Sequence, residues 1–574
     1  MTTPLPLHRN GIQSELGFLR KLITGQGIGE AHDDEKTYLE IAEKWAIDQQ
    51  TLDAYPYLAR VKRLSEAGWI HLRLLTDFMS IGTIPQRWDD LNTHQAMFPV
   101  DMADRQKARQ ARIEKTNVTV LNYHTTEVKR ENYTSAQALK ENFSSSTEDS
   151  SLRFKLYVVE DLSRDVIEIL GQKFEIEPDF FRAHIVDFAW HTVRNRCRNP
   201  PMLDIIRRHQ DWTELRYITL RYFDYQKNFK AAILEADGFN ILRRVNDDLS
   251  NTLFWDKEGA VVGLTRSRAT FWLQPTHLQR GTPVGIFLLD PTVTQGVPLW
   301  RGRRPLWLAS TTCDQPTTPR PPIQDNFFED FVFWAQQDDL CPNHGANVSP
   351  ALVPIQVLLH LVCSEWTTML DYIRTRLAQI DWEFSKPQSR RPDEERYAHT
   401  LGKLHIWKRL VPLCRGMVSE TIQHIDQFSS RIGTIVATLE SASAEGSSQV
   451  TANSPTTTTS LPSQGNWTLI SHYESDFKRI KEQLDEYQVR IDQLTAVANS
   501  IISNNNSQRS LQDNRNIGHL TRLATFFIPL SVIAGILSMQ PNVNDISDST
   551  FKLYFAISLP LAVVITAATI VFRR

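Results

Sequence analysis

The chain has 574 residues, a formal net charge of −3 and 22% charged residues, so it exceeds one typical domain and gives no general case for nucleic-acid binding. Its five cysteines are scattered and never stand at CxxC spacing, which argues against a disulfide framework or a zinc site and is typical of a reducing cytosol. The N-terminus has no continuous apolar core like that of a signal peptide, so we expect it to be cytosolic.

Residues 1–151 form a polar region that predicts helical patches, such as Glu35–Tyr57, and carries little functional signal. Aromatic and β-branched residues then predict strands at 154–162, 215–225, 269–273 and 284–289. Strands mixed with helices predict a cytosolic α/β domain over residues 152–312. After the first strand, Ser163 is placed to cap a helix that we expect to end at Gly171.

Two carboxylates, Glu160 and Asp161, close the first of these strands. A catalytic pair would have to face one substrate, but neighbouring residues on a strand point to opposite faces. We therefore expect a helix-capping and solvated role for both. The chain shows no nucleophile-and-base signature, phosphate-binding glycine loop or metal-ligand spacing, so we expect no enzymatic activity and no cofactor.

A proline-rich linker at 313–325 leads into a helical region at 326–440. His360 lies in an apolar stretch there, where a core histidine is a commoner explanation than a metal ligand. The Ser/Thr-rich stretch at 441–466 has a composition that does not pack a core, and it predicts a disordered loop.

Apolar residues recur at alternating steps of four and three from Tyr473 to Ile501. This 3.5-residue repeat is typical of a coiled coil, although a helix packed inside its own subunit produces the same pattern. With either explanation, we expect residues 467–519 to form a rigid stalk helix that leads into the C-terminal apolar segments.

Two apolar stretches follow, Leu520–Gln540 and Leu553–Phe572. Each has the roughly 20 residues that a helix needs to cross a hydrocarbon core about 30 Å thick, so both predict membrane spans. The link at 541–552 is too short to form a domain, so the two spans predict a hairpin. Basic residues flank the spans on the side of the chain that we expect in the cytosol, so both termini are predicted to be cytosolic and the link external. These residues are Arg509, Arg515, Arg522, Arg573 and Arg574.

One face of the first span becomes smaller and more polar toward Gln540. Its members recur at steps of three, four and seven, and they are Ile517, Ala524, Ile528, Ser531, Gly535 and Ser538. A packing seam between two membrane anchors is one explanation of the small residues. The gradient of size and polarity favours the other explanation, the wall of a water-filled pore.

The same stretch carries a resemblance to a known family. LTRLATFFIPLSVIAGILSMQ (520–540) resembles the first membrane helix of the CorA-type magnesium transporters, which typically ends in Gly-Met-Asn. This chain departs from that pattern with Ser538-Met539-Gln540. The cytosolic part resembles the fungal CorA-like subgroup through LYVVEDLSRDVIEILG (156–171), IEPDFF (176–181) and WTELRYITLRYF (212–223).

The resemblance implies a CorA-like homopentamer in which the first membrane helix of each subunit lines a channel for divalent cations, magnesium above all. The pore-lining residues that it implies are Asn514, Ile517, Leu520, Ala524, Ile528, Ser531 and Gly535. Ser538, Met539 and Gln540 would form the selectivity mouth, where a ring of amides acts on the water shell of Mg²⁺, since that ion dehydrates reluctantly. In a pentamer, Asp545 and Asp548 in the link would add an external acidic ring that attracts cations.

The altered motif keeps two further hypotheses open. In the first, the protein is a transport-inactive CorA-like protein whose hairpin anchors a cytosolic regulatory or interaction domain. In the second, it is a channel for zinc or another transition metal, although the pore face lacks His and Cys. The expected partners are membrane lipid, further copies of the chain and divalent cations, as transported and as regulatory ions, but not nucleic acid. We expect a protein with two membrane spans, and favour the plasma membrane.

Overall fold

The computed structural model describes most of the chain downstream of residue 51. The described residues are 52–82, 102–145 apart from 126, 151–186, 203–301 apart from 208, 244, 248–256, 258, 276–277 and 279–280, 325–337, 350–385, 394–445, 465–539 and 548–571. The expected linker at 313–325, except for its last residue, and residues 446–464 of the Ser/Thr-rich stretch lie outside these ranges. The chain divides into two units, which we describe one at a time: Met1–Gln379 with Ile406–Val489, and Ile380–His405 with Arg490–Arg574.

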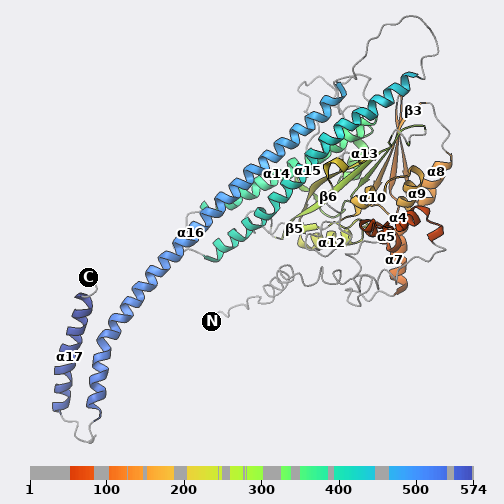
Figure 1. Ribbon diagram of the computed structural model, residues 1–574. Coiled ribbons are helices and arrows are strands. Elements are labelled where there is room, and N and C mark those ends of the chain that lie inside the picture. The colour runs from red at the N-terminus through yellow and green to blue at the C-terminus, as the bar shows by residue number, and fades with distance from the viewer. Residues whose placement is uncertain are drawn as a thin grey trace. The chain divides into compact units, whose positions relative to one another are not determined.

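The first unit contains an eight-stranded mixed sheet with the order β2-β1-β3-β7-β6-β4-β8, in which β5 pairs with β6. Figure 1 labels β3, β5 and β6 of this sheet. The strands β3 and β7 are parallel, and the other pairs are antiparallel. The strands are β1 Val118–His124, β2 Val128–Tyr133, β3 Leu152–Glu160, β4 Trp212–Phe223, β5 Val245–Asp247, β6 Val261–Leu273, β7 Val284–Leu289 and β8 Val297–Pro298.

The four strands expected from the sequence correspond to β3, β4, the end of β6 and β7. The sheet nevertheless begins before residue 152, because β1 pairs with β3 and β2 pairs with β1. Val118 and Val120 of β1 are fully buried, so this part of the chain contributes directly to the core of the α/β domain. The residues of β3 that pair with β1 lie 28 to 41 residues downstream, and a local sequence pattern does not reveal such a pairing.

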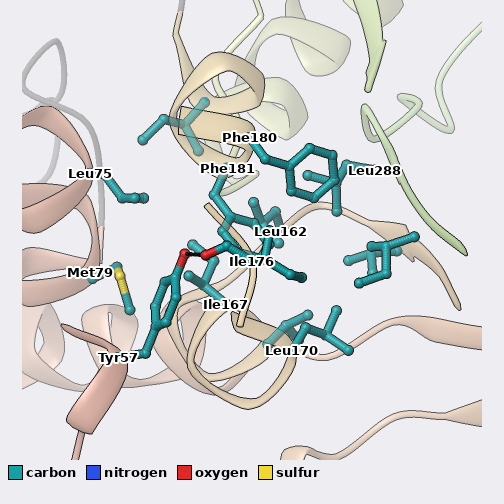
Figure 2. Packing of buried hydrophobic residues seen from close by; sticks show 14 of the residues in the cluster. Tyr57, Leu75, Met79, Leu162, Ile167, Leu170, Ile176, Phe180, Phe181 and Leu288 are labelled. Atoms are coloured by element: carbon teal, nitrogen blue, oxygen red, sulfur yellow. Dashed lines mark hydrogen bonds between the residues drawn. The ribbon is translucent and has the colours of Figure 1, made fainter. Parts of the chain in front are cut away.

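Short helices pack around the sheet. They are α4 Pro56–Glu66, α5 Arg73–Ile81, α7 Met102–Glu114, α8 Ala136–Ser145, α9 Arg164–Phe174, α10 Pro178–Ile185, α11 Asp204–Arg207, α12 Gln226–Asp237 and α13 Phe327–Trp334, with 3-10 turns at Ile70–Leu72 and Leu299–Arg301. Figure 2 shows Tyr57 of α4 and Leu75 of α5 in one apolar cluster with Ile167 and Leu170 of α9 and Leu288 of β7. Residues from the expected N-terminal polar region therefore help to form the main core.

The helix after β3 differs in detail from the expectation. Ser163 occupies the N-cap position of α9 with an extended backbone, but its hydroxyl forms no capping hydrogen bond. The helix continues beyond Gly171 to Phe174, and the left-handed residue that follows it is Glu175, with φ of 53°. Gly171 lies inside the helix, and an added Cβ there would stand only 2.7 Å from the ring of Tyr57, so the close packing of Tyr57 accounts for the glycine.

Four long helices follow: α14 Leu352–Ser385, α15 Glu394–Glu445, α16 Gly465–Leu537 and α17 Asp548–Val571. The helix α16 is continuous, so the expected stalk at 467–519 and the apolar stretch that follows it belong to one helix. The helix α15 includes residues 441–445, which we had assigned to the Ser/Thr-rich loop. The helix that contains the second predicted membrane span begins earlier than expected, since residues 548–552 of the predicted link are helical.

The apolar repeat of α16 is covered within the chain. Phe477, Ile480 and Leu484 are 0–2% exposed in the first unit, where Tyr473 hydrogen-bonds His360 of α14 at 3.1 Å and Asp485 pairs with Arg415 of α15. This burial favours packing inside the subunit as the explanation of the 3.5-residue repeat. The hydrogen bond with Tyr473 indicates a packing role for His360, and burial lowers the pKa of the His360 imidazole to about 4.

Candidate pore segment

The end of α16 and the helix α17, both in the second unit, lie side by side (Figure 1). The hydroxyl of Tyr554 in α17 donates a hydrogen bond of 3.4 Å to the carbonyl oxygen of Leu530 in α16. The residues of α16 on this side are the covered ones: Pro529 is buried, and Thr525, Phe526, Leu530 and Ile533 are half-buried. They define what we call the α17-facing side of α16.

The residues that we expect to line a pore are all exposed in this single chain. They are Asn514, Ile517, Leu520, Ala524, Ile528, Ser531 and Gly535. A helix has 3.6 residues per turn, so most of this set falls on the side of α16 opposite the α17-facing side. Ile528 is 60% exposed, and an added Cβ on Gly535 would meet no atom within 4 Å. The structure therefore gathers the predicted residues on one uncovered face, while their role in a pore stays a prediction.

The expected selectivity mouth lies where α16 ends. Ser538 and Met539 continue the chain as a turn, in which the Ser538 amide donates to the Ala534 carbonyl at 2.9 Å, and Met539 is 85% exposed. Ser538 is not among the described residues with a positive φ, so its backbone does not need the freedom of the glycine found in the family motif. Gln540 and Asp545 lie outside the described residues, and Asp548 is the first residue of α17.

The polar groups of this part of α16 are satisfied by the helix itself. The hydroxyls of Thr521, Thr525 and Ser531 each donate to the carbonyl four residues earlier, at 2.7–2.9 Å. Such bonds remove the cost of a bare hydroxyl in an apolar medium, and they also bend helices slightly. Pro529 lies between them and has no N–H, so it cannot donate to the Thr525 carbonyl.

The side of α17 that packs on α16 is narrow. Ser558 and Ala562 are 0% exposed, one helical turn apart, and Tyr554 precedes them by one more turn. Small residues at this spacing let two helices approach closely. Together with the exposed face of α16, this leaves α17 on one side of α16 and the predicted pore residues on the other.

Length and composition also mark a second helix as a candidate membrane span. Leu352–Phe384 of α14 is long and apolar enough, but 78% of its most apolar window is buried inside the protein. The window in His472–Ile536 of α16 is only 6% buried, and Lys552–Ile565 of α17 is a shorter apolar helix. Burial therefore identifies α14 as a core helix, whereas the apolar window of α16 is mostly exposed in the described part of the chain.

The comparison with protein families concerns this same part of the chain. Residues 456–574 match the family model described as CorA-like Mg²⁺ transporter protein. We call them the CorA-like segment. The family is one of channels and transporters and not of enzymes, in agreement with the expectation from the sequence.

Two solved structures are also similar to the chain. One is the CorA magnesium transporter from Methanocaldococcus jannaschii, with 8% identity, a TM-score of 0.34, and coverage of 80% of this chain and 97% of that one. The other is the full-length CmaX protein, with 11% identity, a TM-score of 0.35, and coverage of 80% and 98%. No curated protein matches the chain.

Outside the CorA-like segment, the structure corrects the role expected for two carboxylates. Asp161 is 2% exposed and accepts hydrogen bonds from the amides of Asn240 and Ile241, at 3.1 and 2.9 Å, and from Lys115 at 2.6 Å. Glu160 accepts from the amide groups of Asn117 and Asn326, and burial raises the pKa of its carboxyl. The expected helix-capping and solvated role is therefore wrong. Asp161 is enclosed and Glu160 is partly buried, and the backbone at Asp161 is left-handed, with φ of 54°.

A second cluster, formed by His184, Thr270 and Asp290, is arranged like a catalytic triad but is not accessible to a substrate. Nδ1 of His184 lies 3.1 Å from the Thr270 hydroxyl, and Nε2 lies 3.5 Å from the Asp290 carboxylate. His184 and Thr270 are 0% exposed, and Asp290 is bound by two nitrogens of Arg243 at 2.6 and 3.0 Å. No substrate reaches such a group, and burial lowers the pKa of His184. No cluster of three or more metal-binding side chains occurs among the described residues.

Proposed function

We propose that this protein is an integral-membrane channel or transporter for divalent cations, Mg²⁺ above all, in which α16 from several copies of the chain lines the pore. The observation that carries the proposal is the uncovered face of α16 opposite α17, inside the segment that matches the transporter family. A simple two-helix anchor would cover its small and polar residues by packing them between its own helices. Here α17 covers a different side, so Ser531 and Gly535 are left for another neighbour or for water.

The exposed face has the chemistry of a gated pore. Ile517, Leu520 and Ile528 would form a hydrophobic constriction, which blocks ions by excluding water. Ser531 and Gly535 would widen the path and make it more polar beyond the constriction. The amide of Gln540 would stand at the mouth, where five such groups would bind the water shell of Mg²⁺ rather than the bare ion.

The arrangement in the membrane follows from charge. With both termini in the cytosol and the link outside, Asp545 and Asp548 would form the external acidic ring that concentrates cations. We favour a homopentamer in the plasma membrane, on the family resemblance of the sequence. The helix α16 is 73 residues long, and in this arrangement it would connect the cytosolic part of the protein directly to the pore.

One observation favours a second candidate function, a transport-inactive protein whose two membrane helices anchor a regulatory domain. Ser538-Met539-Gln540 stands where the transporters typically have Gly-Met-Asn. Gln540 keeps the amide of the family's asparagine but adds a methylene and a rotatable bond, which loosens any ring built from it.

The test is Mg²⁺ flux into liposomes that contain the purified oligomer, with protein-free liposomes as the control. We expect flux above the control, at least tenfold lower flux in Gln540→Ala, and flux close to that of the natural chain in Gln540→Asn, which restores the family's amide. Equal flux in both variants would remove Gln540 from the mechanism. No flux of magnesium, zinc, cobalt or nickel through the assembled oligomer would favour the anchored regulatory protein.

A further inference from the structure

We propose that Tyr554 is a positioning residue for the pore: its hydroxyl bond to the Leu530 carbonyl sets the orientation of the part of α16 that follows Pro529. The inference rests on the proposed function, since it concerns the face of α16 that would line the pore. Three features of the second unit support it. They are the weak point of α16 at Pro529, the small buried residues of α17 that contact α16, and the position of the Tyr554–Leu530 hydrogen bond.

The weak point is the segment around Pro529. A proline inside a helix removes one backbone hydrogen bond and pushes the preceding turn away, so the two parts of the helix are joined less rigidly. The hydroxyls of Thr521, Thr525 and Ser531 bond to carbonyls of the same segment, which adds to its tendency to bend. The residues on the two sides of Pro529 can therefore change direction relative to each other.

The contact with α17 does not by itself lock the rotation of α16. Its buried residues on α17 are Ser558 and Ala562, which bring the helices close but have no long side chain to interlock with α16. The Ser558 hydroxyl is buried and forms no hydrogen bond. A directional bond is needed to select one orientation, and Tyr554 provides it.

The position of this bond is specific. Tyr554 bonds to Leu530, the residue directly after Pro529, and so holds the first turn beyond the weak point. In an apolar medium no water competes for the Leu530 carbonyl. Hydrogen bonds between membrane helices typically change an equilibrium by about threefold. Loss of the Tyr554 hydroxyl should therefore let the turns that carry Ser531 and Gly535 rotate away from the pore.

The experiment measures which side of α16 is in contact with water. Single cysteines are introduced as Ser531→Cys on the exposed face and Ile533→Cys on the α17-facing side, in the reconstituted full-length protein. The rate of labelling by a membrane-impermeant maleimide is measured for each, with the chain without an added cysteine as background. We expect Ser531→Cys to react faster than Ile533→Cys, and Tyr554→Phe to lower the ratio of the two rates about threefold.

Phe555→Leu is the matched control, because Phe555 is 53% exposed and adjacent to Tyr554 but does not face α16. It should leave the ratio unchanged. An unchanged ratio in Tyr554→Phe would overturn the role of Tyr554. If Ser531→Cys reacts no faster than Ile533→Cys in the otherwise natural chain, the pore face itself is wrong, and the proposed function falls with it.

A second variant tests the role of the weak point without depending on Tyr554→Phe. Pro529→Ala restores the missing N–H and stiffens the helix, so it should change the labelling ratio by itself and make the ratio insensitive to Tyr554→Phe. An unchanged ratio in Pro529→Ala would show that α16 does not bend there, and would overturn the inference even if Tyr554→Phe failed to assemble.

Discussion

Gly171→Ala offers a sharp test of the packing that builds the core of the first unit. Gly171 lies inside α9, where alanine is normally the better residue by about 1 kcal/mol. An alanine Cβ at this position would stand 2.7 Å from two ring atoms of Tyr57, about 0.7 Å closer than the 3.4 Å at which ordinary contact begins. The outcome depends on whether the ring of Tyr57 can move.

The structure holds Tyr57 at three points, and Figure 2 shows it beside two of these partners, Ile176 and Phe181. Its hydroxyl donates to the Ile176 carbonyl at 2.8 Å, its amide donates to the Glu168 carboxylate at 2.7 Å, and its ring meets Phe181 edge-on at 5.9 Å. Overpacking in such a place costs about 1–3 kcal/mol, and a shift of the ring that breaks its hydroxyl bond costs about 1 kcal/mol more. After subtraction of the helix preference, Gly171→Ala should destabilise the protein by about 1–3 kcal/mol.

The assay is the apparent melting temperature of the solubilised protein at a fixed heating rate. The matched control is Gly416→Ala, because Gly416 also lies inside a helix of the first unit but an added Cβ there meets no atom within 4 Å. Gly171→Ala should lower the melting temperature by at least about 2 °C, and Gly416→Ala should leave it unchanged or raise it. Equal melting temperatures for the two variants would refute the account of Tyr57 as a rigid neighbour.

Two further predictions concern titratable groups of the first unit. Burial alone would raise the pKa of the Glu214 carboxyl, but the guanidinium groups of Arg268 and Arg216 outweigh that effect and lower it to about 2. Because the carboxyl has a lower pKa in the folded protein than its value near 4.5 in the unfolded chain, it stabilises the fold above pH 4.5, and this stabilisation is lost as the pH falls toward 2. Glu214→Gln should therefore reduce the melting temperature at pH 7, and the difference in melting temperature from the natural chain should shrink between pH 4.5 and pH 2. A constant difference in melting temperature over that range would contradict this prediction. Burial raises the pKa of the thiols of Cys363 and Cys414 to about 12, so neither should react with iodoacetamide at pH 8 until the protein is unfolded, as mass spectrometry of the modified peptides would show.

The sequence alone predicted the structural features that depend on residues close together in the chain. The aromatic and β-branched residues of β7 predicted the strand Val284–Leu289 with its observed ends, because strand preference is local. The lengths of the apolar stretches predicted that α16 and α17 would be helices, and the spacing of small residues predicted one distinct face on α16. Helical periodicity fixes which residues share a face, whatever that face contacts.

The tertiary structure decided what each of these elements contacts. Asp161 is enclosed rather than solvated because the amides of Asn240 and Ile241, 80 residues away in sequence, fold onto it. The 3.5-residue repeat of α16 indicated two kinds of partner equally, and the burial of Phe477 favours the chain's own helices. The contact between Tyr554 and Leu530 likewise shows which side of α16 is covered by α17. A pattern of residues defines a surface, but the neighbour of that surface is set by the packing of segments distant in sequence, where close fit and paired polar groups select one arrangement.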